Sequence, residues 1–283
     1  MAAEFAYTIW QWGGSKEGVL TGCKEVSERG YHYFESTKPF IDLFKDDKAQ
    51  LREILDQYSI APTGAYFHLN GTKENDLDDV EAKIPFMLEF GMKLMTVQAL
   101  GVFGRSANEE ELRYVLETVT KIGKICKPYG IRPCVHPHYN TTIMIPSDID
   151  FILQNTDPDE VWFCPDTAHI TAGGGDAAAI VEKYKTRVGF THLKDILTAD
   201  KLKSEGMEEG KEVYANFREL GEGNVDFPSV FKSLKSVDYD GFLCVELDRS
   251  QAKFACYSRC FLTSYFCIAV PYNEKDIFFW YYF

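Results

Sequence analysis

The sequence predicts an α/β protein built as a single (β/α)8 barrel of the TIM type. Short apolar runs rich in β-branched and aromatic residues alternate with longer segments of helical period, which is typical of parallel βαβ units. Eight such runs are separated by seven helical segments. The length of 283 residues fits one barrel, which typically takes about 250 residues, with a short extension.

The strand candidates are apolar runs of six to eight residues. In chain order they are 5–10, 31–36, 62–69, 93–99, 132–138, 161–166, 188–195 and 241–248. The helix candidates carry apolar residues at every third or fourth position. They are 16–29, 48–59, 77–90, 108–130, 146–156, 176–187 and 227–239. In the fourth of these, Asn108 is suited to cap the helix and Gly130 to end it.

A doubly wound open sheet could use the same elements. However, no GxGxxG turn follows the first strand candidate, and the glycine-rich run 173–175 follows the sixth instead. We therefore prefer the closed barrel. The longest connection, 196–226, is charged and interrupted by glycines, and we expect it to form a lid or an oligomer contact.

The chain divides at about residue 250. Residues 1–250 hold the barrel elements, whereas residues 251–283 are atypically rich in aromatic residues and cysteine. A barrel needs an eighth helix to cover its last strand, and aromatic residues recur at helical intervals from Phe254 onward. We expect part of this segment to supply that helix. The remainder is either a contact surface or a tail altered relative to natural relatives.

Composition argues against several classes of partner. The net charge is −13 and no Lys/Arg cluster is present, which disfavours nucleic acid and anionic membranes as partners. The first residues lack the pattern of a signal peptide, and the eight cysteines form no CxxC pair. We expect a cytoplasmic protein with mostly buried thiols, present as a homo-oligomer or as a subunit of a complex.

Ionisable residues gather at the ends of the last four strand candidates. They are His136, His138, Asp166, His169, His192, Lys194 and Glu246. In a TIM barrel the carboxyl ends of the strands surround the active site. Imidazole and carboxylate groups that converge there suit a divalent ion such as Mn²⁺, Co²⁺, Zn²⁺ or Mg²⁺. The pattern therefore predicts a metal site.

The chain also resembles the sugar phosphate isomerase/epimerase superfamily, the xylose-isomerase-like TIM barrels, up to about Asp248. The stretches that carry the resemblance are ERGYHYFES, DTAHITAGGGDAAAIVEKYKTRVGFTHLKD and ELGEGNVDFPSVFKSLKSVDYDGFLCVELD. Within this superfamily, VHPHYNTTI together with HLKD is most similar to the inosose dehydratase branch, which has a His-x-His sequence at the fifth strand.

The resemblance implies a divalent ion held by one residue from each of strands five to eight. Asp166, His192 and Glu246 match the family's Asp, His and Glu ligands. At the fifth strand the family's usual glutamate is replaced, and the ligand is either His136, which we prefer, or His138. Mn²⁺ is the expected ion, with Co²⁺, Mg²⁺ and Zn²⁺ as alternatives.

Other residues are candidates for contacts with the substrate. The resemblance implies that His169 contacts substrate hydroxyls and that Lys194 and Asp195 orient or charge-balance the ligands. Further substrate-binding candidates are His68, Trp12 with its neighbour Trp10 as a stacking wall, and Gln98. Glu246 or Glu35 is the candidate base. His68, His138 and His169 are candidate acids, because an ordinary imidazole pKa near 6.5 suits proton transfer close to neutrality.

The expected substrate is a small keto sugar or cyclitol. A metal-bound ketone is acidified at its α C–H, and the resulting enediolate either loses a β-hydroxyl, as in a dehydratase, or is reprotonated, as in an isomerase or 3-epimerase. Loss of the fifth-strand carboxylate favours elimination, because epimerisation needs opposed proton donors on both faces. The competing class is a non-catalytic sugar-binding or scaffold subunit.

Overall fold

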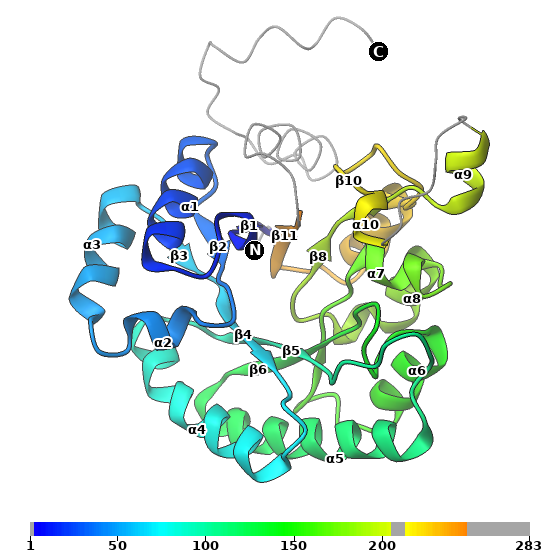
Figure 1. Cartoon of the computed structure of the whole chain (residues 1–283), viewed down its shortest axis with the longest axis horizontal. Coiled ribbons are helices and arrows are strands. Elements are labelled where there is room, and N and C mark those ends of the chain that lie inside the picture. The colour runs from blue at the N-terminus through cyan, green and yellow to red at the C-terminus, as the bar shows by residue number, and fades with distance from the viewer. Residues whose placement is uncertain (1–2, 205–212, 248–283) are drawn as a thin grey trace, which may run out of the picture.

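The structure is a computed structural model, and it describes residues 3–204 and 213–247. In these ranges, parallel strands form the wall of a barrel, and the helices lie around it (Figure 1). The prediction of a (β/α)8 barrel is confirmed. The predicted C-terminal segment 251–283, with its eighth helix, lies outside the described residues, as does Asp248.

The barrel wall consists of two sheets that meet along two seams. Their strand orders are β3-β2-β1-β11-β8 and β4-β5-β6-β7. At one seam β3 (Ala61–Pro62) and β4 (Gly64–His68) follow each other with a single residue between them, so they fill one position in the wall. At the other seam, isolated parallel bridges join Phe163 to Val188 and Asp166 to His192. These bridges close the barrel.

The remaining wall strands lie within their predicted ranges or overlap them. They are β1 (Glu4–Thr8), β2 (Tyr33–Glu35), β5 (Leu94–Gln98), β6 (Arg132–His136), β7 (Trp162–Phe163), β8 (His192–Leu193) and β11 (Phe242–Val245). Several strands are shorter than predicted. Cys164 and Phe190, for example, lie outside β7 and β8 but stay fully buried. Their apolar pattern therefore continues beyond the hydrogen-bonded ladder.

The predicted helices are also present. They are α1 (Lys16–Glu28), α3 (Lys48–Tyr58), α4 (Lys73–Glu89), α5 (Glu109–Cys126), α6 (Pro146–Gln154), α8 (Ala177–Tyr184) and α10 (Phe227–Lys235). As predicted, Asn108 caps α5, because its side chain accepts from the backbone N–H of Glu111 at 2.9 Å. The turn η2 (Lys127–Tyr129) follows α5, and Gly130, at φ +66°, ends it in the left-handed region.

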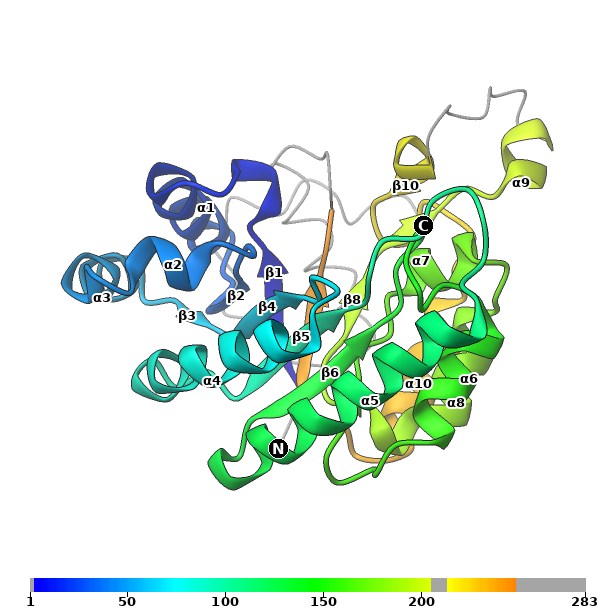
Figure 2. The same cartoon turned by 60° about the horizontal axis from the view of Figure 1, so that its bottom comes forward.

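Several short elements were not predicted, because they are too brief to show a period. They are η1 (Trp10–Trp12), α2 (Phe40–Phe44), α7 (Thr167–Ala172), α9 (Ala199–Ser204) and η4 (Val213–Asn216), with the strands β9 (Asp195–Ile196) and β10 (Phe217–Arg218). The short turn η3 (Lys185–Arg187) forms the end of the predicted helix 176–187. β9 and β10 pair antiparallel. In Figure 2, α9 and β10 lie beyond the carboxyl ends of the barrel strands. Within the described part of the chain, no helix is both long and apolar enough to cross a bilayer.

The barrel interior is filled by side chains in layers. A separate apolar cluster is formed by one residue from each of several wall positions. Its members are Ala6, Leu94, Cys134, Cys164, Phe190 and Cys244. Side chains on a strand alternate between its two faces, so the residue two positions further on points into the barrel as well. That next layer contains Thr8, Thr96, His136, Asp166, His192 and Glu246. An apolar layer therefore lies beneath the ionisable residues.

Candidate active site

Three of the predicted metal ligands meet at the carboxyl ends of the strands. Asp166, His192 and Glu246 are buried, and one potential ligand atom from each lies within 4.8 Å of the others. They come from three consecutive wall positions, since His192 is bridged to Asp166 on one side and β8 pairs with β11 on the other. The closed barrel is what brings them together.

Asp166 has two separate functions in the fold. Its Oδ1 atom accepts a hydrogen bond from the backbone N–H of His169 at 2.8 Å and so caps α7. Its Oδ2 atom is buried and has no hydrogen-bond partner among the described residues. Burial raises the pKa of Asp166 above its usual value, against the lowering effect of nearby Lys194. One oxygen thus fixes the side chain while the other faces the site.

His192 lies between two carboxylates. Its Nε2 atom is 2.7 Å from Oε2 of Glu35, and its Nδ1 atom is 2.6 Å from Oε2 of Glu246. Burial lowers the pKa of His192, but the two carboxylates outweigh burial and hold that pKa well above its usual value. Although these contacts are short, none of the four atoms has a partner in hydrogen-bond geometry. These two imidazole nitrogens and two carboxylate oxygens therefore lie close together without being paired in hydrogen-bond geometry.

Lys194 lies beside the same carboxylates. Its Nζ atom is 2.8 Å from Oε1 of Glu246 and 3.5 Å from Oδ2 of Asp166. Burial would raise the pKa of Glu246, but Lys194 and His192 hold it well below its usual value. The ammonium group also lies 4.7 Å from the ring centroid of Phe217. Lys194 therefore neutralises part of the negative charge of the site.

His136 and His138 have different environments. His136 is fully buried, its ring centroid is 4.6 Å from that of His192, and neither of its nitrogens has a hydrogen-bond partner in the described part of the chain. His138 is half-buried and packs on His169 with 3.8 Å between centroids. Its Nδ1 atom lies 2.8 Å from the carbonyl oxygen of Tyr139. Of the two, His136 is the one whose lone pairs are available.

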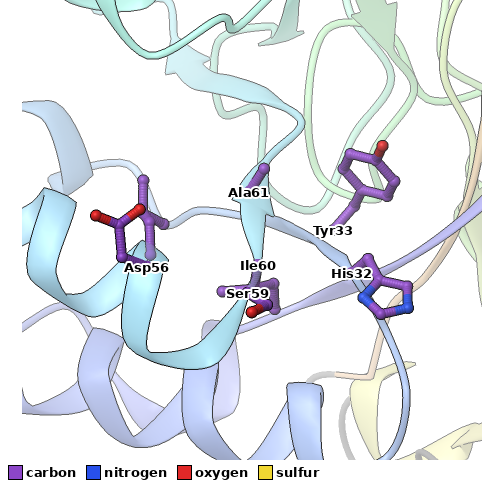
Figure 3. A pocket seen from close by; sticks show the side chains of 7 residues that line it. His32, Tyr33, Asp56, Ser59, Ile60 and Ala61 are labelled. Carbon is purple, nitrogen blue, oxygen red and sulfur yellow. The ribbon is translucent and has the colours of Figure 1, made fainter.

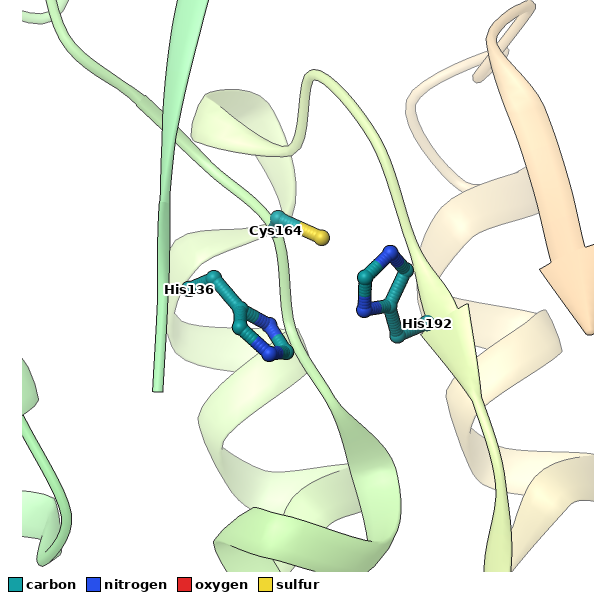
Figure 4. Close-up of side chains that lie close together, drawn as sticks. All are labelled: His136, Cys164 and His192. Carbon is teal, nitrogen blue, oxygen red and sulfur yellow. The ribbon is translucent and has the colours of Figure 1, made fainter. Parts of the chain in front are cut away.

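The four predicted ligands do not form one tight cluster. His136 belongs to a second triad with Cys164 and His192, in which one ligand atom from each residue also lies within 4.8 Å of the others. Figure 4 shows the Cys164 thiol and the two imidazoles pointing toward one another. The sequence indicates only a buried thiol at Cys164. Its position two residues before Asp166, hence on the same face of the strand, was the signal that identifies it.

Two predicted acids are not cationic near neutral pH. Burial lowers the pKa of His169 well below its usual value, with further lowering by His138 and Lys194. Burial and Lys38 lower the pKa of His68 to about 4. The expectation of an ordinary imidazole pKa is therefore wrong for both residues. The backbone N–H of Tyr139 donates to Nδ1 of His169 at 3.2 Å, so the neutral His169 ring carries its proton on Nε2.

Residues from the early strands complete the site. Glu35 Oε1 accepts a hydrogen bond from the hydroxyl of Thr96 at 2.6 Å, which fixes the carboxylate. Gln98 accepts from the hydroxyl of Tyr66 at 2.5 Å. The ring of Tyr66 stacks on His192 at 6.3 Å with 7° between the planes, and His68 lies next to it at 5.1 Å. Tyr66 was missed because a tyrosine in a strand carries no distinctive sequence signal.

Two other expectations are corrected. Trp12 does not lie against these residues, because its ring packs on Tyr7 at 6.4 Å and approaches Gly22 of α1. Its neighbour Trp10 instead contacts Tyr66 at 4.4 Å. Asp195 does not orient the ligands.

The carboxylate of Asp195 instead holds the loop that follows β10. It accepts hydrogen bonds from the backbone N–H groups of Ile196, Gly221, Gly223 and Val225 at 2.8 to 3.0 Å. A Cβ atom on Gly223 would lie 2.2 Å from Oδ1 of Asp195, so this close approach requires glycine. These four hydrogen bonds satisfy the carboxylate of Asp195, so the role of this residue is structural.

Part of the connection predicted as a lid covers the site. The ring of Tyr214 lies 6.0 Å from that of His169 and 6.1 Å from that of His138. Phe217 lies 5.0 Å from His169, edge to face. These aromatic rings lie against the imidazoles of His138 and His169, and they reduce the access of water to Lys194.

A surface pocket lies elsewhere on the molecule. It has a volume of about 510 Å³ and is lined by His32, Tyr33, Leu55, Asp56, Ser59, Ile60 and Ala61. Figure 3 shows these residues where β2 and β3 begin and α3 ends. The pocket is therefore at the amino ends of the strands, opposite the ionisable cluster, where active sites of TIM barrels are not found.

A comparison with protein families agrees with this geometry. A sequence model of the family described as "Xylose isomerase-like TIM barrel" matches residues 23–257. The chain belongs to that family. The matched range of this xylose isomerase-like TIM barrel includes Asp166, His192 and Glu246.

Two of the similar proteins are inosose dehydratases from Clostridium species. The chain is 30% identical over 186 residues to an inosose dehydratase of Clostridium perfringens, and the match covers 62% of this chain and 61% of that protein. The chain therefore spans about three fifths of the length of this relative. It is 28% identical over 250 residues to an inosose dehydratase of Clostridium beijerinckii, covering 80% of this chain and 82% of that protein.

A solved structure shows the same fold. The IolI protein, determined with a bound zinc atom, superposes with a TM-score of 0.72 at 16% identity, covering 93% of this chain and 97% of that one. At this level of identity the likeness concerns the fold.

Proposed function

We propose that this protein is a divalent-metal-dependent sugar lyase, a dehydratase that removes the proton α to the carbonyl of a keto sugar or inosose and then expels a β-hydroxyl. The observation that carries this proposal is the buried cluster of Asp166, His192 and Glu246, whose inward-facing oxygen and nitrogen atoms lie close together without hydrogen-bond partners among the described residues. Buried polar atoms are otherwise almost always paired. An ion would satisfy them together.

The donor set fits a divalent cation. Two carboxylates and an imidazole suit Mn²⁺, the ion expected from the sequence, and a catalytic site needs about three protein ligands and an open position for substrate. When bound, such an ion polarises the ketone and stabilises the negative charge that develops on its oxygen. His136 lies next to this set and could extend it.

The surrounding residues have the chemistry that elimination needs. Glu35 is held by Thr96 and is not one of the three clustered ligands, so it is our candidate for the base that removes the α-proton. Glu246 is the alternative base. Nε2–H of His169 and the ammonium of Lys194 lie 3.5 Å apart and can both donate to a departing hydroxyl. The half-buried His138 and the pair formed by Gln98 and His68 are candidates for contacts with other hydroxyls.

Water must be limited around an enediolate, because stray protonation would return the substrate. Tyr214 and Phe217 cover the imidazoles and are suited to this role. The names of the Clostridium relatives support the dehydratase reaction and a cyclitol substrate.

One observation favours an isomerase or 3-epimerase as a second candidate. The sequence disfavours this class, because the fifth-strand carboxylate that epimerisation would use is missing. Glu35 and Glu246, however, lie on opposite sides of His192 at 2.7 and 2.6 Å, so two opposed carboxylates are present after all. Such a pair could remove a proton on one face and return it on the other.

The test is a screen of inososes and ketoses in D₂O with Mn²⁺, Co²⁺, Zn²⁺ or Mg²⁺. We expect metal-dependent deuterium uptake at the α carbon together with an unsaturated, dehydrated product. Deuterated substrate or its epimer without dehydration would instead support the second candidate. If no substrate exchanges its α-proton with any ion, the protein is better described as a non-catalytic sugar-binding or scaffold subunit.

Asp166→Asn and Asp176→Asn make a matched pair for this test. Asp176 caps α8 through Ala179 as Asp166 caps α7 through His169, but Asp176 is exposed and lies outside the clustered ligands. We expect Asp166→Asn to abolish metal-dependent exchange and Asp176→Asn to retain it. Equal activity in the two variants would contradict the proposed role of Asp166.

A further inference from the structure

Three cysteines occupy equivalent places in the barrel interior. Cys134, Cys164 and Cys244 pack in the same apolar cluster, and each stands two residues before an ionisable residue of the site. The thiol of Cys134 contacts the carbonyl oxygen of Arg132 at 3.4 Å, and that of Cys244 contacts the carbonyl oxygen of Val245 at 3.9 Å. Cys164 differs, because its sulfur belongs to the triad with His136 and His192.

A second, independent observation concerns His136. Both of its ring nitrogens are buried, and neither has a hydrogen-bond partner among the described residues. An unpaired buried polar group costs free energy, because it has lost its hydrogen bonds to water without replacing them. His136 is fully buried, and one of its ring nitrogens lies within 4.8 Å of both the sulfur of Cys164 and a ring nitrogen of His192. A bound ion would satisfy the imidazole.

We propose that Cys164 is a thiolate ligand for a metal ion that is also bound by His136 and His192, and that this triad makes the site selective for Zn²⁺ or Co²⁺ over Mn²⁺ and Mg²⁺. The inference rests on the proposed metal-dependent function, since His192 also belongs to the cluster with Asp166 and Glu246. It replaces Mn²⁺ with Zn²⁺ or Co²⁺ as the expected ion. One sulfur and two imidazoles are softer ligands than carboxylates, and soft ligands favour zinc.

The charges and protons of this step balance. When the ion binds, the S–H bond of Cys164 breaks, its proton passes to solvent, and a metal–sulfur bond forms. One thiolate and two neutral imidazoles then leave a net charge of +1 at this triad. The adjacent carboxylates of Asp166 and Glu246 are placed to compensate it, with Lys194 beside them. The oxidation state of the metal does not change.

The test is spectroscopic and does not depend on turnover. The full chain is freed of metal with a chelator and titrated with Co²⁺, and near-ultraviolet absorption is followed for sulfur-to-cobalt charge transfer. We expect this band in the wild-type protein and its loss in Cys164→Ser. Cys134→Ser is the matched control, because Cys134 is equally buried in the same cluster but its sulfur does not belong to a ligand triad. It should keep the band.

A measurement on the wild type covers the case in which Cys164→Ser fails to fold. X-ray absorption of the zinc-loaded protein distinguishes a sulfur ligand at about 2.3 Å from nitrogen and oxygen ligands at about 2.0 to 2.2 Å. One sulfur per zinc is expected. Zinc outcompetes Mn²⁺ at most protein sites, so where Cys164→Ser folds, competition between equal concentrations of the two ions should leave a larger excess of bound zinc in the wild type than in this variant.

The outcomes separate this inference from the proposed function. Stoichiometric metal binding without a sulfur signal would overturn the role of Cys164 and leave the metal-dependent lyase intact. A sulfur signal that Cys134→Ser also removes would overturn the assignment to Cys164. If the wild-type protein bound Mn²⁺ or Mg²⁺ but neither Co²⁺ nor Zn²⁺, the thiolate ligand would be wrong and the metal dependence would stand; if it bound none of the four ions, both would be wrong.

Discussion

Glu35 and His192 contact each other across the barrel, with 2.7 Å between Oε2 of Glu35 and Nε2 of His192. The two residues belong to β2 and β8, which are separated in the sheet by β1 and β11. The contact therefore exists because the sheet curves into a barrel and its interior side chains converge. It links a candidate base to a candidate metal ligand.

Removing the charge of Glu35 should separate catalysis from metal binding. In Glu35→Gln the candidate base is lost while Asp166, His192 and Glu246 remain, so we expect turnover to fall by about 10²- to 10⁴-fold with metal content unchanged. Deuterium uptake and metal analysis on the same sample measure both. Thr96→Val is the control, because it removes only the hydrogen bond to Oε1 and should cost much less. Wild-type exchange in Glu35→Gln would assign the base to Glu246.

The two functions of Asp166 should respond differently to two substitutions. Asp166→Ala removes the cap of α7 and the metal-facing oxygen, so it should lose metal and about 1 kcal/mol of unfolding free energy in the metal-free protein. Asp166→Asn retains a good capping group and should lose metal affinity with little loss of stability. Urea unfolding with a chelator and metal titration distinguish the effects. Equal stability of the two variants would mean that the cap contributes nothing.

Lys194 should stabilise the metal-free site more than the metal-bound one. Lys194→Met leaves the buried carboxylates of Glu246 and Asp166 without this cation, which should cost about 3 to 5 kcal/mol. A bound divalent ion supplies positive charge in its place, so part of the loss should be recovered. Thermal unfolding with a chelator and with Zn²⁺ measures this difference.

Lys183→Met is the control for Lys194. Lys183 pairs with Asp150 at 2.7 Å on the surface, with its side chain 46% exposed, so its loss should change stability little whether or not metal is present. If Lys194→Met caused only as small a loss of stability as Lys183→Met, and metal did not change that loss, Lys194 would not balance the charge of the site.

The aromatic cover should affect the reaction more than the fold. Phe217→Ala exposes His169 and removes the cation–π contact with Lys194, so we expect a lower kcat and a larger share of solvent exchange without elimination. The ratio of deuterium uptake to dehydrated product reports this directly. Phe103→Ala, at a side chain that is 78% exposed, should leave the ratio unchanged. An unchanged ratio in Phe217→Ala would exclude a covering role.

The start of α5 should be sensitive to acid. The hydrogen bonds from Arg105 and from the backbone of Asn108 lower the pKa of Glu111 from 4.5 to about 2. Because the folded-state pKa is depressed, this carboxylate contributes stability above about pH 4.5, and the contribution is lost as the pH falls toward 2. Glu111→Gln should therefore destabilise the protein at pH 7 and be neutral near pH 2. Urea unfolding at the two pH values provides the check, and a pH-independent effect would contradict it.

Most of the architecture followed from local patterns. Alternating apolar runs and amphipathic segments located the strands and the main helices, because burial of one face imposes a period of 2 or 3.6 residues. Asn108 and Gly130 marked the boundaries of α5 because capping chemistry is local. Short elements such as α7 and β10 escaped prediction, since six residues do not establish a helical period and two residues do not establish a strand.

The sequence by itself determined that ionisable residues stand at the strand ends, and with the family resemblance it indicated the metal-site candidates Asp166, His192 and Glu246. Only the tertiary structure decided which atoms meet. It separated His136 from His138, turned Asp195 toward backbone N–H groups, packed the ring of Trp12 against Tyr7 and α1, and added Tyr66 and Cys164 to the site. The reason is physical: spacing along a strand fixes the face on which a side chain lies, whereas its neighbours depend on how the barrel closes.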